Sequence, residues 1–126
     1  VINENDVVAT EEIRLGDNDT LAAMVTNLVE ADLMIILTNQ KGYFDKNPDN
    51  HSDAKLIKKC NIKDLQDSTI SLDGKSKLGT GGFKTKLHAV KLTTSNITTS
   101  VIASGYEINI LKKILNKKSV GTIFHV

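Results

Sequence analysis

The sequence has one cysteine, few aromatic residues and no long apolar run. Cys60 is the sole cysteine, so no disulfide can form within the chain, and this suits the reducing cytoplasm in which we expect the protein. No run approaches the roughly 20 apolar residues that a membrane span needs, so we expect no membrane partner. Aromatic residues make up only 4% of the chain, too few for a platform that stacks nucleic-acid bases, and we expect no nucleic-acid partner.

The N-terminal residues lack both an initiator methionine and the basic and apolar stretches of a secretory signal. Val1 and Ile2 resemble the end of a strand, and we therefore expect the chain to be a piece of something longer. Its 126 residues fit one domain, and an apolar fraction of 40% is enough to form a core.

Charge is unevenly distributed along the chain, although the net charge is only +1. Residues 1–32 hold eight acidic residues and a single base, Arg14, which gives −7, whereas the rest of the chain holds fifteen lysines and seven acidic residues, which gives +8. This asymmetry predicts a surface that attracts cations early in the chain and one that attracts anions later.

An amphipathic helix followed by a buried strand is predicted over residues 18–37. The helix starts at Asn18 or Asp19, either of which is a suitable N-cap, and ends near residues 30–32. Its apolar stripe has the spacing of one helix face and comprises Leu21, Met24, Val25, Leu28 and Val29. The run "LMIIL", residues 33–37, is typical of a strand buried on both faces, as in a parallel sheet.

The remaining chain continues to alternate between strands and helices. We expect a loop over 39–53, a short strand over 54–59, a helical turn within 61–67, a helix bearing Phe83, Leu87 and Val90, a strand over 99–104, a short helix over 107–116 and a last strand over 120–124. This order predicts an α/β fold around a mostly parallel sheet. Ligands of such sheets collect at the carboxyl ends of strands, which here are Thr38–Asn39 and Ser104–Gly105.

The stretch "GTGGFKTK", residues 79–86, is the strongest local motif. Three glycines in four residues allow a ligand to approach the backbone, and the start of the following helix offers free amides that suit phosphate. It is not a Walker P-loop, which needs G-x-x-x-x-G-K-[ST], and it is not the dinucleotide fingerprint G-x-G-x-x-G, because Lys84 occupies the place of the third glycine. From the residues alone, a phosphate site and a flexible loop that leads into a helix are equally good interpretations.

Two clusters of carboxylates and amides, "NEND" at 3–6 and "GDND" at 16–19, are further candidates. Each is suited to bind an amino group, organise lysines or help hold Mg²⁺, although turn formation and helix capping explain them as well. Asp19 is the sharper candidate, because an acid at a helix N-terminus is expected to stay ionised. The histidines, His51, His88 and His125, lack metal-ligand spacing, and we predict no metal site made by protein residues.

Several of these motifs together resemble the glutamate 5-kinases of the amino-acid kinase family. They are the stretch from "VINEND" through "GDNDTLAAMV" to "LTNQKGYFDKNP", then "LGTGGFKTKLHAV", "VIASGYE" and "VGTIFH", in that order over nearly the whole chain. The resemblance implies a three-layer α/β/α sandwich on a mainly parallel sheet, incomplete here, with residues 1–126 as the C-terminal, nucleotide-binding part of the kinase domain.

The reaction that the resemblance implies is transfer of the γ-phosphoryl group of ATP, with Mg²⁺, to the side-chain carboxylate of L-glutamate. The product is glutamyl 5-phosphate, and the step is the first of proline biosynthesis. The complete enzyme would be a homo-oligomer.

Motif matching also carries residue roles to this chain. It implies that the substrate is bound by Asn3, Asp6 and Asn18, with Asp17 assisting. Asp19 and Lys86 are the implied catalytic pair, in which Asp19 positions lysines and Lys86 neutralises charge on the transferring phosphoryl group. The nucleotide would be contacted by Thr38 and Asn39 and by the loop of Thr80, Gly81, Gly82, Phe83, Lys84, Thr85 and Lys86.

Three departures from the family pattern leave an alternative open. The family's N-terminal part, with a glycine-rich turn and a second catalytic lysine, has no counterpart here, and neither has the RNA-modification-type C-terminal domain of many bacterial members. Asn39 also stands where the family usually has Asp. The alternative is a non-catalytic fragment that binds nucleotide weakly or only associates with other subunits. A related kinase for aspartate, carbamate or uridylate is disfavoured by the paired "NEND" and "GDND" clusters.

Overall fold

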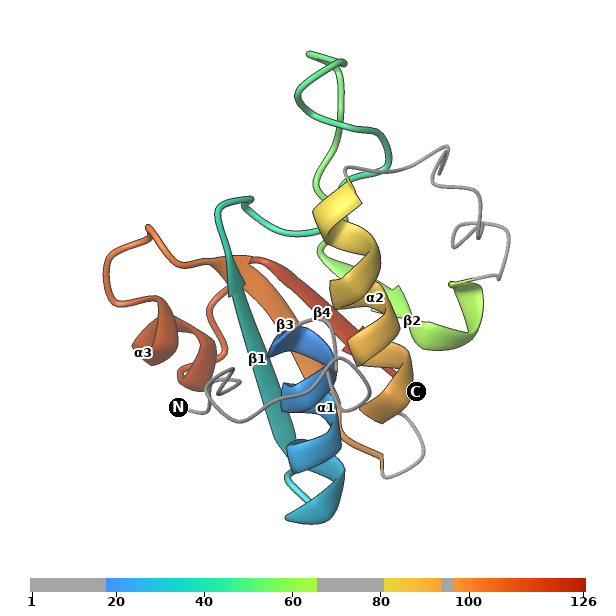
Figure 1. Cartoon of the computed structure of the whole chain (residues 1–126). Helices are drawn as coiled ribbons and strands as arrows, with labels where there is room; N and C mark the ends of the chain where they lie inside the picture. Colours follow the sequence, from blue (N-terminus) through green and yellow to red (C-terminus); the bar gives the residue numbers. More distant parts are fainter. Residues whose placement is uncertain (1–17, 66–80, 94–96) are drawn as a thin grey trace, which may run out of the picture.

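The computed structural model describes residues 18–65, 81–93 and 97–126, in which helices and strands alternate (Figure 1). Their order is α1 (Asn18–Leu28), β1 (Leu33–Thr38), β2 (Lys59–Asn61), the 3-10 turn η2 (Ile62–Asp64), α2 (Gly81–Thr93), β3 (Thr99–Ser104), α3 (Ile110–Leu115) and β4 (Thr122–His125). No helix in these ranges is long and apolar enough to cross a membrane.

The four described strands form one sheet in the order β1-β3-β4-β2. β1 and β3 are parallel, with Leu33 opposite Thr99 and Thr38 opposite Ser104. β2 and β4 are also parallel, and the antiparallel pairing of β3 with β4 joins the two pairs. The sheet is therefore mixed but mostly parallel, and the predicted α/β class is confirmed.

Helices cover both faces of this sheet, which confirms the layered architecture. Figure 1 shows α1 and α2 side by side on one face and α3 on the other. The larger core lies under α1 and α2 and is made of Ala23, Met34, Ile36, Tyr43, Ile62, Leu65, Phe83, Leu87, Ala89, Val90, Ile102 and Phe124. A smaller cluster of Val101, Ala103 and Ile110 lies under α3. The molecule thus has three layers with a hydrophobic cluster on each side of the sheet.

Most predicted elements are present, but one strand lies elsewhere. β3 covers the expected residues 99–104, and α2 buries Phe83, Leu87 and Val90 as its spacing indicates. The strand expected over 54–59 is wrong, because the observed strand is Lys59–Asn61, which pairs with Ile123–His125. Its position is set by a partner more than sixty residues away, and local pattern does not contain that information.

The predicted apolar stripe of α1 is not the face that is buried. Ala23 and Thr26 are buried, whereas Met24, Leu28 and Val29 are 51%, 83% and 64% exposed. The buried face is made of small side chains because α1 lies close to α2, and Asn27 Nδ2 donates a hydrogen bond to the Leu92 carbonyl at 2.9 Å. Asn18 and Asp19 lie in the first turn of the described helix instead of preceding it as caps.

β1 is buried fully on one face only, which corrects the expectation of two buried faces. Met34 and Ile36 point into the larger core, but Leu37 on the other face is 45% exposed. Leu33 packs against the cluster under α3. Because β1 is an edge strand of the described sheet and α3 has only six residues, the second face is covered in part.

Replacement of Phe124 should be among the most destabilising changes in the chain. The side chain is fully buried, with its ring 6.0 Å from that of Tyr43. We expect Phe124→Ala to lower the free energy of unfolding by about 3–5 kcal/mol, because it leaves a cavity in the larger core. The matched control, Leu28→Ala on the exposed face of α1, should change it by less than about 0.5 kcal/mol. Urea unfolding of both variants measures this, and similar losses in the two would contradict the assigned core.

Candidate functional site

The candidate site lies where two helices begin beside the carboxyl ends of two strands. α1 leads into β1 and α2 leads into β3 through short connections, so each helix runs opposite to its strand. Because β1 and β3 are parallel, both helices start at the edge of the sheet where Thr38 and Ser104 lie (Figure 1). The fold therefore places the two helix starts, from segments far apart in sequence, at one edge of the sheet.

Asp19, Thr85 and Lys86 meet between the two helices. Lys86 Nζ lies 3.0 Å from Asp19 Oδ2, and Thr85 Oγ1 donates a hydrogen bond to the same oxygen at 2.8 Å. The Lys86 and Asp19 side chains are only 19% and 18% exposed. The ion pair is thus largely removed from water, where charge-assisted hydrogen bonds are stronger than at an open surface.

The helix pair explains why these three residues meet. Asp19 lies opposite residues 85 and 86, and Asn27 lies opposite Leu92, so α1 and α2 run in the same direction. Parallel helices bring the positive ends of their dipoles together, and an acid in the first turn offsets that charge. Asp19 occupies this position in α1. Its carboxylate therefore interacts favourably with the helix ends and with Lys86.

Thr38 and Asn39 form a turn at the carboxyl end of β1. The Thr38 carbonyl accepts a hydrogen bond from Gly105 N–H at 2.8 Å, which ties the ends of β1 and β3 together. Thr38 Oγ1 donates to Asn39 Oδ1 at 3.3 Å and accepts from Gln40 N–H at 3.4 Å. Asn39 is exposed, and the Oδ1 atom that it uses here is one that an aspartate would also have.

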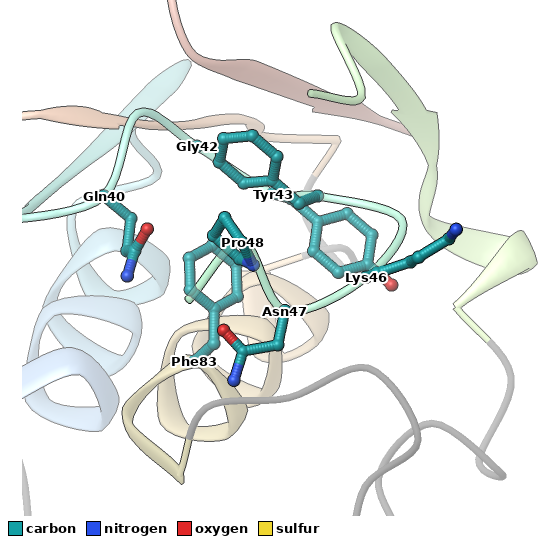
Figure 2. Close-up of a pocket in the computed structure, with 8 residues that line it drawn as sticks. Gln40, Gly42, Tyr43, Lys46, Asn47, Pro48 and Phe83 are labelled. Carbon is teal, nitrogen blue, oxygen red and sulfur yellow. The ribbon is translucent and has the colours of Figure 1, made fainter. Parts of the chain in front are cut away.

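The segment after this turn packs on the start of α2 (Figure 2). Tyr43 is buried and stacks on Phe83 with ring centroids 5.7 Å apart. Its ring is also tilted against that of Phe124. Burial raises the pKa of the Tyr43 hydroxyl above its ordinary value. Tyr43 therefore holds the segment in place against α2 and β4.

A small hollow separates this segment from Phe83. Its volume is about 10 Å³, room for roughly one water molecule, and Figure 2 shows Gln40, Asn47 and Pro48 around it with Phe83. Gly42 allows this segment to pass close to Thr122 of β4, since a Cβ on residue 42 would lie 2.8 Å from Thr122 Oγ1 and the φ of Gly42 is +156°. Beyond the hollow, the expected loop is partly paired, through a bridge between Phe44 and Leu56.

The other predicted site residues are distributed as follows. Asn3, Asp6, Asp17 and Thr80 lie outside the described residues. Gly81 and Gly82 open α2, Phe83 points into the core, Lys84 is half-buried in the first turn, and Asn18 is exposed at the start of α1. The motif assigned Thr85 to the nucleotide, and its contact with Asp19 was not predicted, because only the packing of the two helices reveals it.

Neither a large cavity nor a cluster of metal ligands marks the candidate site among the described residues. A hollow of about 770 Å³ lies under α3, over Leu33, Val101 and Ile123, on the opposite face from the Asp19–Lys86 pair. Within the described part of the chain, no three His, Cys, Asp or Glu residues gather as metal ligands do. The chemistry of the candidate site therefore rests on its charged pair and not on the size of a cavity.

Comparison with known sequences gives the same family over most of the chain. Residues 1–104 match the amino acid kinase family. A glutamate 5-kinase from Methylococcus capsulatus is 50% identical over 123 residues, which are 98% of this chain and 33% of the relative. One from a Marinomonas species is 48% identical over 122 residues, 97% of this chain and 33% of the relative. The chain thus spans about a third of the length of these relatives.

Solved structures share the fold at low sequence identity. A UMP kinase from Bacillus anthracis has a TM-score of 0.68 at 16% identity, over 88% of this chain and 41% of that one. A Giardia lamblia carbamate kinase bound to AMP-PNP has a TM-score of 0.65 at 18% identity, over 86% of this chain and 35% of that one. These structures share the fold, and the sequence match over residues 1–104 establishes that the chain belongs to the amino acid kinase family.

Proposed function

We propose that this chain is the nucleotide-binding part of a kinase that phosphorylates the side-chain carboxylate of L-glutamate with ATP. The product would be glutamyl 5-phosphate, the first intermediate of proline biosynthesis. The observation that carries the proposal is the largely buried Asp19–Lys86 pair at the carboxyl edge of the sheet. The identity of 48–50% to proteins named glutamate 5-kinase supports the choice of substrate.

The pair suits phosphoryl transfer because that reaction depends mainly on positioning and on neutralising charge. A lysine whose position is fixed by a carboxylate can meet negative charge that develops on the transferring group without first losing side-chain freedom. Lys86 lies in the second turn of α2, just after the glycine-rich stretch. Phosphates that approach the start of α2 would thus reach both its N-terminal amides and the Lys86 ammonium group.

The nucleoside would lie over the segment of residues 38–48. The hollow beside Phe83 is too small for a nucleobase, so the base would rest on its open side, near the amides of Gln40 and Asn47. Mg²⁺ would arrive on the nucleotide, because Mg²⁺ in kinases is held largely by substrate phosphates, and the Asp19 carboxylate is occupied by Lys86 and Thr85. The ion would add charge neutralisation to that of Lys86.

The 126 residues alone should not make glutamyl phosphate. They span about a third of the relatives' length, and the resemblance implies a second catalytic lysine that has no counterpart in the chain. The measurement is to incubate the purified chain with ATP, Mg²⁺, glutamate and hydroxylamine, which traps acyl phosphates as hydroxamates. Glutamate-dependent hydroxamate from a folded, monodisperse sample would contradict this prediction.

Lys86→Ala should lower turnover by roughly 10²-fold or more, because it removes a cation that acts mainly in the transition state. The test is a hybrid enzyme in which residues 1–126 replace the matched segment of the Methylococcus capsulatus glutamate 5-kinase. The matched control is Lys63→Ala, which removes the charge of an exposed lysine in η2. Steady-state rates would refute the role of Lys86 if both variants stayed within about threefold of the parent hybrid.

Asn39→Asp should change the affinity for ATP by less than about tenfold, because the carboxylate keeps the oxygen that accepts from Thr38 Oγ1. Calorimetric titration of the chain and of its variant with a non-hydrolysable ATP analogue measures the change. If Asn39 faced the phosphates, the added negative charge would weaken binding. A change in Kd larger than about tenfold in either direction would therefore contradict the prediction that Asn and Asp at position 39 serve the nucleotide equally well.

A further inference from the structure

We infer that Thr85 is a positioning residue that fixes the Asp19 carboxylate for Lys86, and that its hydroxyl does not donate to the nucleotide phosphates. This inference rests on the proposed function, because it assigns a task within the same site. The residue-by-residue resemblance placed Thr85 among the nucleotide contacts. The described geometry points instead to a hydroxyl that acts within the protein, through Asp19.

The first support is the geometry around one oxygen atom. Asp19 Oδ2 accepts from Thr85 Oγ1 at 2.8 Å and from Lys86 Nζ at 3.0 Å. A lysine ammonium group is a mobile point charge on a flexible stem, so its contact alone does not fix the orientation of a carboxylate. A threonine on a helix, in contrast, has a short, branched side chain with few rotamers. Thr85 therefore supplies the more rigid of the two contacts.

The second support is the number of protons that Thr85 can donate. A threonine hydroxyl has one proton, and an ionised carboxylate only accepts hydrogen bonds. The proton of Thr85 is therefore directed to Asp19. Phosphate oxygens are acceptors too, so the hydroxyl cannot donate to a phosphate while it holds Asp19. The hydroxyl proton can therefore serve Asp19 or a nucleotide phosphate, but not both at once.

The third support is the place of the contact in the fold. Thr85 is half-buried in α2, and Asp19 belongs to the first turn of α1. The hydrogen bond thus connects the two parallel helices one residue before the lysine that the mechanism uses. Its loss would leave Asp19 with Lys86 as its remaining described partner, and the carboxylate would be free to change rotamer.

A spectroscopic test isolates this role from catalysis. Thr85→Val keeps the branched shape and removes the hydroxyl, whereas Thr85→Ser keeps the hydroxyl. Side-chain coupling constants of Asp19, measured by NMR on the 126-residue chain, report its χ1 rotamer. We expect a single rotamer in the parent and in Thr85→Ser, and rotamer averaging in Thr85→Val. A single, unchanged rotamer in Thr85→Val would overturn the inference.

Binding and kinetics then separate positioning from nucleotide contact. Thr85→Val should leave the Kd of the chain for a non-hydrolysable ATP analogue within about twofold, and in the hybrid enzyme it should lower kcat about tenfold or more with KM for ATP nearly unchanged. Thr85→Ser should restore kcat. The control, Thr99→Val in β3 on the α3 side of the sheet, should alter none of these values.

The opposite pattern would contradict the inference. If the Kd or KM for the nucleotide rises more than about tenfold in Thr85→Val while kcat is unchanged, Thr85 contacts the nucleotide and the inference is wrong. A parent chain that binds no nucleotide would refute the proposed function, and the Asp19 rotamer would still decide whether Thr85 positions the carboxylate. The two failures are therefore distinguishable.

Discussion

The close, parallel packing of α1 and α2 is the constraint on which the candidate site depends. Ala23 and Thr26 form the buried part of α1, and these small side chains allow the two helix backbones to approach. Hydrogen bonds then join the helices near both ends, from Thr85 and Lys86 to Asp19 and from Asn27 to Leu92. A larger side chain at position 23 would separate the helices and so lengthen the contacts of Asp19. The position of the ion pair is thus set by packing several residues away from it.

The sequence pattern correctly predicted those elements whose buried positions follow from their own residues. The helix over residues 81–93, β3 and the layered α/β class follow from spacing and from apolar runs. The buried face of α1 did not, because hydrophobicity marked Met24, Leu28 and Val29, whereas the neighbouring helix selected small residues. β2 was misplaced for a related reason, since its pairing with Ile123–His125 decides where it lies. Both errors occur where a distant segment determines the local structure.

The candidate site was predictable in its members but not in its contacts. Asp19 and Lys86 are 67 residues apart, and no spacing rule joins them, so only the resemblance to a family paired them in advance. Thr85 was assigned to the nucleotide because the motif treats residues 80–86 as one loop, whereas the structure has residues 81–86 inside α2. On a helix, neighbouring residues face different directions. Phe83 accordingly points into the core and Thr85 towards α1, so members of one motif have different surroundings.

The charge distribution of the chain gains a physical meaning from this arrangement. One acid of the first quarter, Asp19, pairs with one lysine of the remainder, Lys86, and both side chains are largely buried. Burying a single charge there would be costly, and the pair offsets that cost only while its hydrogen bonds remain intact. A phosphoryl group that approaches Lys86 adds negative charge next to an existing carboxylate, so the two anions compete for one ammonium group. Under the proposed function, a carboxylate held away from the phosphoryl group by a second donor would lessen that competition. The Thr85 hydroxyl, which donates to the same oxygen, is placed to supply this restraint.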